Sequence, residues 1–598
     1  MLVTAFCGLV AAWSPQGNLA DPPVGLTVVV CAVGQGDGIV LRAPDGTVHV
    51  VDAGPGGQGT ITMLPTIAQL APSSYGFSFL SHFHEDHLGG LDEVLNALPL
   101  QFAYDRGDLN RASGTAINNY LAAAGSRRQQ VTLGASYALG GGASVTVIAF
   151  DGQVLGGAFV DPTTSAQEEN SRSVVLRLEY GLFSMWLGGD LTGGASGTAD
   201  VESPATLACG DVDVYKLNHH GSASSSNLNL IARLQPELAV VSAGVANPYG
   251  HPTSTAVNRI NQAAAARALL STTTGSANTI GFGVCGPIRI DTDGQRYRAT
   301  SNDGSYLDFW CDEIQTPSVA AGELRFSEVH RNPNVVPDTN GEYVEVVNVG
   351  SRPLGLRGLS LVDGGNTITL ASNFLAVPGK PLLFQVDGAP SRNGGQPLGM
   401  PMPSGALSVA NTADNLALTQ SSTTIDQLSY ASGFPGGDGI AAERIDLFGP
   451  QTNANWAPCS TAFGDGDLGT PGARNGADAT PHPVQLAVDV VPGKMTFHAT
   501  ALGLTSSYAS VVVLAYSAGP SFQFGGATIP LGFDPLVEGS LSIPGFVALM
   551  PPGGYRSTEL PYPQPNPVPG IVLYAVHAVV ESNYLVPGVS PAVSFVLP

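Results

Sequence analysis

Residues 81–90, with the sequence SHFHEDHLGG, constrain the fold of this chain more than any other stretch. They follow the apolar run FSFLS, which predicts a buried strand. His82 and His84 then fall at the strand end, and their spacing of two points both side chains to one face. Asp86 and His87 can face the same cavity from the following loop. The glycine pair at 89–90 permits a tight entry into a helix that we expect to begin near residue 91.

These side chains are of the types that bind metal ions. Imidazole and carboxylate suit zinc, and also manganese or iron. The pairs His82/His84 and Asp86/His87 could hold two neighbouring ions. The alternative is a polar loop of satisfied histidines, which usually explains one isolated histidine. It does not explain such dense clustering in a chain with only 12% charged residues, so we predict a metal site.

The rest of the chain predicts several domains, because 598 residues exceed one ordinary core. Apolar strand-like runs alternate with helical segments, such as 61–69 and 254–270, over residues 25–315. This pattern predicts an α/β sandwich. From residue 316 helical periodicity almost vanishes, and GADATPHP (476–483) is typical of a second linker. We therefore expect two all-β sandwich domains, at 316–475 and 476–598.

The net charge of −23 excludes a general basic surface for coating nucleic acid. It does not exclude a nuclease, because a metal site supplies local positive charge. Four arginines in the first domain could steer a polyanion, although surface arginines are common: Arg106, Arg111, Arg172 and Arg177.

The N-terminus resembles a secretory leader. Residues 2–13 form an apolar run of signal-peptide length, and residues 10–12 fit a small-residue cleavage site, although no basic residue precedes Arg42. We expect a leader at 1–24, a secreted or cell-envelope location in a bacterium, and no transmembrane segment, since no apolar run approaches ~20 residues. Cys285 and Cys311 flank a hairpin-like stretch and are either a disulfide or two buried thiols.

Four further stretches narrow the interpretation: VGQGDGIVLRAPDGTVHVVDAGP (33–55), ENSRSVVLRLEYGLFSMWLGGDL (169–191), KLNHHGSASSSN (216–227) and NPYGHP (247–252). Together with the His-x-His-x-Asp-His stretch, and in this order, they resemble the metallo-β-lactamase superfamily and its ComEC-like branch over roughly residues 25–300. The resemblance implies an αββα sandwich with two divalent metal ions, zinc or manganese. It also implies metal-assisted hydrolysis and favours a phosphodiester substrate such as DNA.

The resemblance further implies a role for each motif residue. His82 and His84 hold the first metal, Asp86 and His87 hold the second, and Asp190 bridges them. Asp86 also orients the attacking water. One of the two histidines at positions 219 and 220 closes the second site and the other supports it. Which is which stays open.

Other residues carry weaker implications. Asp52 resembles the structural aspartate that orients the metal-binding loop. Many superfamily members give the first metal another histidine, but none occurs here between His87 and His219. Asn170 matches the Asn–Ser stretch of the ComEC-like branch and could approach the first metal or the substrate.

Two loop residues have two explanations each. His251 could contact substrate or donate a proton to a leaving group, or it could simply pack its loop. Ser222 could hydrogen-bond a phosphate, or it could stabilise a turn.

The segments 322–364 and 453–475 resemble the lamin-tail domain, an immunoglobulin-like β-sandwich. Glu328, Glu342 and Glu345 match its acidic strand positions, and we interpret them as structural or as part of an adhesion surface. FGDGDLG could hold calcium, but a Gly-Asp turn is more typical. Contact with a cell surface or extracellular matrix follows as an expectation. The alternatives are another hydrolase of this fold, acting on phosphocholine esters or lactones, and an adhesion protein with a degenerate enzyme domain.

Overall fold

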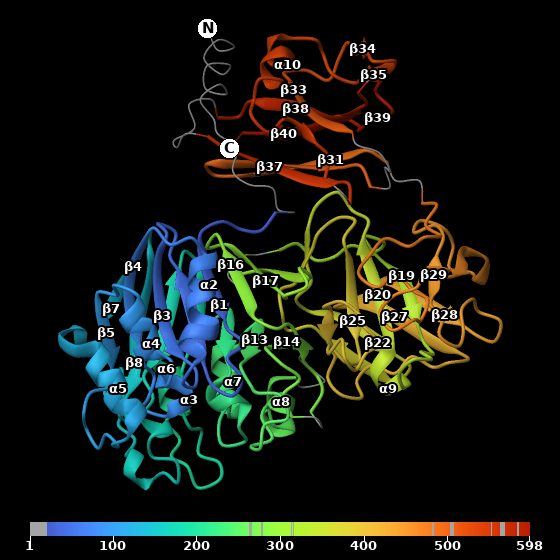
Figure 1. The fold of residues 1–598 in the computed structure, drawn as a ribbon. Helices are drawn as coiled ribbons and strands as arrows, with labels where there is room; N and C mark the ends of the chain where they lie inside the picture. Colours follow the sequence, from blue (N-terminus) through green and yellow to red (C-terminus); the bar gives the residue numbers. More distant parts are fainter. Residues whose placement is uncertain are drawn as a thin grey trace.

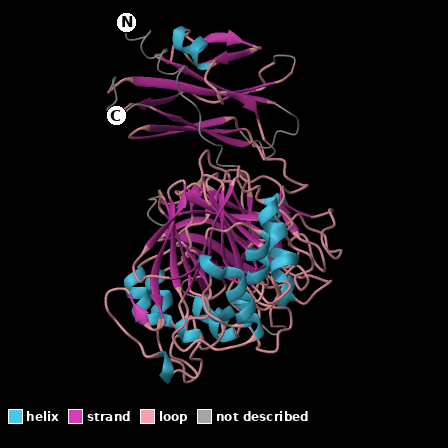
Figure 2. Ribbon diagram, turned by 60° about the vertical axis from the view of Figure 1, so that its left-hand side comes forward, coloured by secondary structure: helices cyan, strands magenta, loops and turns pink. Residues whose placement is uncertain are grey.

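Two β-sheets packed face to face, with helices on both outer faces, form the N-terminal part of the protein (Figures 1 and 2). The computed structural model describes residues 21–261, 266–276, 279–311, 314, 316–480, 483–502, 508–551, 553–562, 569–582 and 585–597. Most of the predicted leader, at 1–24, therefore lies outside the described residues. The four layers are the predicted helix–sheet–sheet–helix sandwich.

The first sheet has the strand order β18-β17-β16-β1-β2-β3-β4-β5-β6. Its strands from β3 to β6 are parallel, and the others pair antiparallel. The bounds are β1 Leu26–Val30, β2 Gly38–Arg42, β3 Thr47–Ala53, β4 Ser74–Phe79, β5 Phe102–Asp105, β6 Arg128–Gln130, β16 Ile288–Thr292, β17 Arg296–Thr300 and β18 Tyr306–Trp310.

The second sheet has the order β15-β14-β13-β12-β11-β10-β8-β7, with β9 paired to β8. Strands β11 to β15 are parallel. The bounds are β7 Ser136–Gly140, β8 Ala143–Phe150, β9 Gln153–Val154, β10 Val175–Tyr180, β11 Phe183–Leu187, β12 Val214–Lys216, β13 Leu238–Val241, β14 Ala268–Ser271 and β15 Gly283–Val284.

The alternation of side chains along β1 shows how the layers form. Leu26, Val28 and Val30 belong to the core between the two sheets, whereas Val29 packs under the helices on the outer face.

The helices of this part are η1 Gly59–Met63, α2 Leu64–Gln69, α3 Glu85–Leu88, α4 Leu91–Ala97, α5 Thr115–Ala124, η2 Gly125–Arg127, η3 Pro162–Thr164, η4 Asn170–Arg172, α6 Glu202–Cys209, η5 Asn218–Gly221, α7 Leu228–Leu234 and α8 Ser254–Ile260.

The expected helix over 254–270 is wrong in its second half. Helix α8 ends at Ile260, and Ala268–Ser271 is strand β14. The alanine-rich composition favours a helix locally, but β14 is buried on both faces as a parallel strand beside β13, and burial between two layers outweighs propensity.

The second part, residues 324–458, is built from strands with one short helix, α9 Asp338–Gly341, and the 3₁₀ turn η6 Asn453–Asn455. One sheet has the order β26-β25-β20-β19-β29-β30 and another the order β23-β22-β27-β28, with the pair β21-β24 beside them. The bounds are β19 Leu324–His330, β20 Tyr343–Asn348, β21 Leu354–Gly355, β22 Leu359–Asp363, β23 Asn366–Thr369, β24 Leu375–Ala376, β25 Pro381–Gln385, β26 Met400–Pro401, β27 Asp414–Gln420, β28 Thr423–Tyr430, β29 Ala442–Arg444 and β30 Trp456–Pro458.

The acidic strand residues of this part are structural. Glu328, Glu342 and Glu345 are all buried, so they do not form an adhesion surface. Each carboxylate accepts a hydrogen bond from a backbone N–H of a distant segment, for example Gly472 N–H to Glu345 Oε2 at 2.8 Å. In FGDGDLG, Asp467 accepts hydrogen bonds from His330 and from the Asn334 N–H, as a turn residue would.

The third part, residues 485–596, lies above the other two in Figure 1 and contains one helix, α10 Pro535–Ser540, among the described residues. Its sheets have the orders β31-β32-β37 and β36-β33-β38-β39, with β40 paired to β38 and a separate β34-β35 hairpin. The bounds are β31 Gln485–Val491, β32 Lys494–Thr500, β33 Ala509–Ala515, β34 Phe522–Phe524, β35 Ala527–Ile529, β36 Val547–Leu549, β37 Tyr555–Pro561, β38 Val572–Val580, β39 Gly588–Val589 and β40 Val593–Val596.

The core between the two sheets continues from the first part into the second. One cluster of buried residues runs from β1 to β30, and Phe309 of β18 packs against Phe374 with ring centroids 4.6 Å apart. The third part touches its neighbours through a small cluster that includes Leu375 and Tyr555, and through an exposed ion pair between Arg352 and Asp489.

Two further expectations concern the cysteine pair and a membrane-spanning segment. Cys285 and Cys311 are buried thiols that are not joined as a disulfide, which decides between the two alternatives. Among the described residues, no helix combines the length and apolar character that crossing a bilayer requires.

Candidate metal centre

The local fold around residues 81–90 positions the predicted ligands at one end of the sandwich. Strand β4 ends just before it, and α4 begins at Leu91 as predicted. Asp86 and His87 lie in the one-turn helix α3 rather than in an open loop. Gly90 lets this segment approach β3, because a Cβ there would lie 2.5 Å from Ala53 O and from Gly59 N.

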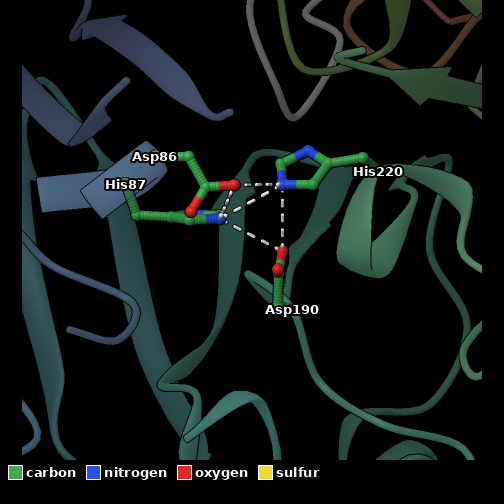
Figure 3. Close-up of side chains that lie close together, drawn as sticks. All are labelled: Asp86, His87, Asp190 and His220. Carbon is green, nitrogen blue, oxygen red and sulfur yellow. Dashed lines mark hydrogen bonds and ion pairs between the residues drawn. The ribbon is translucent and has the colours of Figure 1, made fainter. Parts of the chain in front are cut away.

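Four side chains from three segments converge in Figure 3: Asp86, His87, Asp190 and His220. His87 Nε2 lies 3.2 Å from Asp190 Oδ1 and 3.2 Å from His220 Nε2. His220 Nε2 lies 3.4 Å from both Asp190 Oδ1 and Asp86 Oδ2. Ligand atoms around a tetrahedral zinc ion lie about 3.4 Å apart, so this spacing fits one divalent cation.

A second group shares Asp190. His82 Nε2 lies 3.0 Å from His84 Nδ1 and 3.9 Å from Asp190 Oδ2. His82 is fully buried, whereas His84 is exposed. Asp190 therefore lies between the two groups with one oxygen facing each.

The turn η5 holds the two adjacent histidines in an unusual conformation. His219 has φ 51° and His220 has φ 52°, which are left-handed values that cost non-glycine residues of order 1–3 kcal/mol each. His220 faces Asp86 and His87 and lies in the second group of side chains. His219 Nε2 lies 3.6 Å from Asp190 Oδ2.

Asp52 lies behind the ligands rather than among them. Its Oδ2 accepts a hydrogen bond from His87 Nδ1 at 2.8 Å, and its two oxygens also accept from the Ser81 N–H and hydroxyl. This contact leaves His87 Nε2 as the nitrogen that faces Asp190.

Asp37 and Lys216 were missed as site residues, although both stand in quoted motifs. Lys216 Nζ lies 2.7 and 2.9 Å from the two oxygens of Asp37, and both side chains are buried. Asp37 Oδ1 lies 3.4 Å from His220 Nδ1, which also donates to Ser242 O at 3.0 Å. The only sequence signal was a lysine three residues before the histidine pair in a chain poor in lysine.

The electrostatics of the site favour a bound cation. Against the effect of burial, Asp190 and Asp86 raise the pKa of His87 well above its usual range, and Asp190 and Asp37 raise the pKa of His220 to about 10. The carboxylates thus attract positive charge to this point. Asp190 Oδ1 is buried without a hydrogen bond of normal geometry, and so is Asn170 Oδ1. The donor set therefore fits divalent ions.

The three remaining candidate residues line the same region. Asn170 Nδ2 lies 3.2 Å from His219 Nε2. His251 is buried with its ring 5.3 Å from that of His219, and burial followed by the two neighbouring histidines lowers its pKa to about 4. A neutral His251 suits proton acceptance better than donation. The Ser222 hydroxyl bonds that of Ser224 within its own loop at 2.9 Å.

The four arginines do not form a steering surface. Each is paired with a carboxylate: Arg106 with Asp151 and Glu169, Arg111 with Asp108, Arg172 with Asp151 and Glu168, and Arg177 with Glu179. The expectation that they attract a polyanion is therefore wrong, because their charge is already neutralised.

The family model described as the metallo-beta-lactamase superfamily matches residues 32–245. This region is a metallo-β-lactamase superfamily domain. The match contains every residue of the two ligand groups and ends before His251. The α/β sandwich predicted for the N-terminal part is thereby confirmed.

Three curated proteins resemble short stretches of the chain. Competence protein ComA of Neisseria gonorrhoeae is 37% identical over 95 residues, which is 16% of this chain and 13% of that protein. ComE operon protein 3 of Bacillus subtilis is 41% identical over 86 residues, 14% of this chain and 10% of that protein. Recombination protein 2 of Haemophilus influenzae is 30% identical over 94 residues, which is 16% of this chain and 11% of that protein. The chain thus spans only about a tenth of these relatives.

Solved structures with similar segments include Zn²⁺-bound PqqB from Methylobacterium extorquens, at 14% identity and TM-score 0.22, covering 33% of this chain and 73% of that one. A metallo-β-lactamase from Hirschia baltica matches at 14% identity and TM-score 0.20, covering 33% of this chain and 84% of that one.

Proposed function

We propose that this protein is a dinuclear metal-dependent hydrolase that cleaves phosphodiesters, such as DNA or shorter nucleotide esters. The observation that carries the proposal is the position of Asp190, whose two oxygens face two separate groups of ligand-type side chains. One group contains His82 and His84, and the other contains Asp86, His87 and His220.

Each group in the site would have a separate role in the reaction. Two divalent ions, zinc or manganese, would supply Lewis acidity and make water a stronger nucleophile near neutral pH. Asp86, whose side chain is 31% exposed, would accept a hydrogen bond from the attacking water and orient it. His251 and Asn170 border the site and could position the substrate. Ser222 remains a substrate-contact candidate.

Local similarity to the competence and recombination proteins supports a nucleic-acid phosphodiester as substrate. The charge distribution narrows this choice. Extended duplex binding depends on many free cationic contacts to phosphates, whereas the arginines considered above are paired and the net charge is −23. We therefore expect the substrate to be held mainly at its reacting phosphate.

Hydrolysis of bis(p-nitrophenyl) phosphate and of single- and double-stranded DNA, with added Zn²⁺ or Mn²⁺, tests the proposal. His84→Ala and Asp190→Asn should abolish cleavage, and His49→Gln, a buried histidine away from the site, should preserve it. Activity only on lactones or phosphocholine esters would overturn the phosphodiester assignment. Failure of the protein to bind metal would favour the adhesion alternative.

The location and the accessory domains belong to the same proposal. The apolar run at 2–13 supports a secreted or envelope protein, and the resemblance of 316–475 to the lamin-tail domain supports surface contact. N-terminal sequencing of the protein recovered from culture medium and from cell fractions would test the location. A cytoplasmic protein with an intact N-terminus would refute it.

A further inference from the structure

We infer that His219 is the third imidazole of the first metal position, in place of the histidine that this sequence lacks between His87 and Asp190. His220 then serves the second position, so two adjacent residues serve different ions. The inference rests on the proposed dinuclear centre and concerns the metal position of His82 and His84.

The two oxygens of Asp190 separate the imidazoles into two sets. Oδ1 faces the Nε2 atoms of His87 and His220, at 3.2 and 3.4 Å. Oδ2 faces the Nε2 atoms of His82 and His219, at 3.9 and 3.6 Å. These separations are close to the spacing of about 3.4 Å expected between ligands of one tetrahedral ion. His219 therefore lies on the side of Asp190 that faces His82, whereas His220 lies on the other side.

Hydrogen bonding can leave one nitrogen of the His219 ring available to a metal ion. Its Nδ1 lies 3.3 Å from Ser224 Oγ, which also lies 3.1 Å from Gln167 Oε1 and 2.9 Å from Ser222 Oγ. When Ser224 donates to Gln167, it can accept from Nδ1–H, and Nε2, which faces Asp190, is then the unprotonated nitrogen.

Asn170 is the other polar neighbour of this ring. Its Nδ2 lies 3.2 Å from Nε2 and 3.4 Å from Nδ1. Asn170 would thus help to hold the His219 ring while it borders the substrate site.

The backbone conformation of η5 independently supports the assignment of His219 as a metal ligand. Two consecutive non-glycine residues with positive φ, followed by Gly221 at φ 77°, form a costly turn. In this turn the planes of the two rings lie 71° apart, and each ring meets a different oxygen of Asp190. A second imidazole that merely supported the first would not require this conformation.

Metal titration of the purified full-length protein tests the inference. Zn²⁺ binding is measured by calorimetry and elemental analysis for wild type and for His84→Ala, His219→Ala, His220→Ala and His251→Ala. Removing a residue that only hydrogen-bonds a metal ligand weakens metal binding by about 10–100-fold. We expect His84→Ala and His219→Ala to weaken the same single ion by more than about 100-fold, and His220→Ala to weaken the other. His251→Ala, which also removes a buried imidazole, should retain both ions.

Proton NMR of the Co²⁺-loaded protein supplies a second readout, since each ligating imidazole with a free N–H gives a strongly shifted exchangeable signal. His219→Ala should lose one such signal, and His219→Gln should not restore it. Wild type with two ions and a His219→Ala variant that binds both with unchanged affinity would overturn the inference but not the proposed function. Wild type that binds fewer than two ions would overturn the dinuclear centre itself. Two ions without phosphodiester cleavage would leave the inference standing and remove the proposed function.

Discussion

Replacing Lys216 by methionine should destabilise the protein strongly, because it removes the cation that faces a buried carboxylate. Lys216 and Asp37 are 1% and 2% exposed, and Nζ contacts both carboxylate oxygens. Breaking a buried ion pair from one side costs about 3–5 kcal/mol. The first two parts share one core, so with an unfolding entropy of about 2 cal/mol/K per residue over roughly 430 residues the melting temperature should fall by about 3–5 °C. Calorimetry or circular dichroism would measure this fall.

The double variant Asp37→Asn/Lys216→Met separates support of the fold from support of the metal centre. Removing both charges should restore most of the lost stability, because no unpaired charge remains buried. Zn²⁺ affinity at the His220 position should stay weakened by about 10–100-fold, because the carboxylate 3.4 Å from His220 Nδ1 is gone.

Asp308→Asn is the matched control. It breaks the buried Arg298–Asp308 pair in the same domain, so it should lower stability and leave Zn²⁺ affinity unchanged. If Lys216→Met melted at the wild-type temperature, or if the double variant bound Zn²⁺ like wild type, the role assigned to this ion pair would be refuted.

Three further outcomes follow from the structure. Full burial raises the pKa of Glu202 from 4.5 to about 7, so the folded state binds the extra proton between these values and stability should fall by about 3 kcal/mol as pH rises from 4.5 to 7. The free energy of unfolding, measured with urea across this pH range, should show this decline, and the Glu202→Gln variant should lack it. An equal decline in the variant would contradict the assignment. Gly90→Ala should cost about 1–3 kcal/mol and weaken metal binding, because its Cβ would meet two backbone atoms at 2.5 Å; a variant with wild-type melting and metal content would show that the segment can shift. His251→Ala should lower the kcat for bis(p-nitrophenyl) phosphate without loss of metal, and unchanged kinetics would favour the packing role.

The sequence predicted the layers and the ligand types because both depend on local spacing. The apolar strand-like runs and the dense ligand motif at 82–87 could be recognised without tertiary knowledge. Strand β14 could not be recognised from the sequence, because its alanine-rich surroundings favour a helix locally. Burial between two layers makes it a strand.

The assignments that failed or stayed open depend on contacts between distant segments or on backbone angles. Asp37 and Lys216 are separated by 179 residues and meet only after folding. The positive φ values at 219 and 220, which direct the two rings apart, leave no mark in composition or periodicity. The arginines are a different case, because Arg111, Arg172 and Arg177 each pair with a carboxylate two to four residues away, which the sequence offered and the interpretation overlooked. Only Arg106 depends wholly on distant partners.

The unbroken core between the first two parts has a thermodynamic consequence. Residues from β1 to β30 share one buried cluster, with Phe309 and Phe374 in contact across the boundary. The two parts should therefore unfold as a single cooperative unit, and free energy gained from ions at Asp190 would stabilise the β-rich neighbour as well. The third part, joined by a few side chains near Tyr555, is placed to melt on its own.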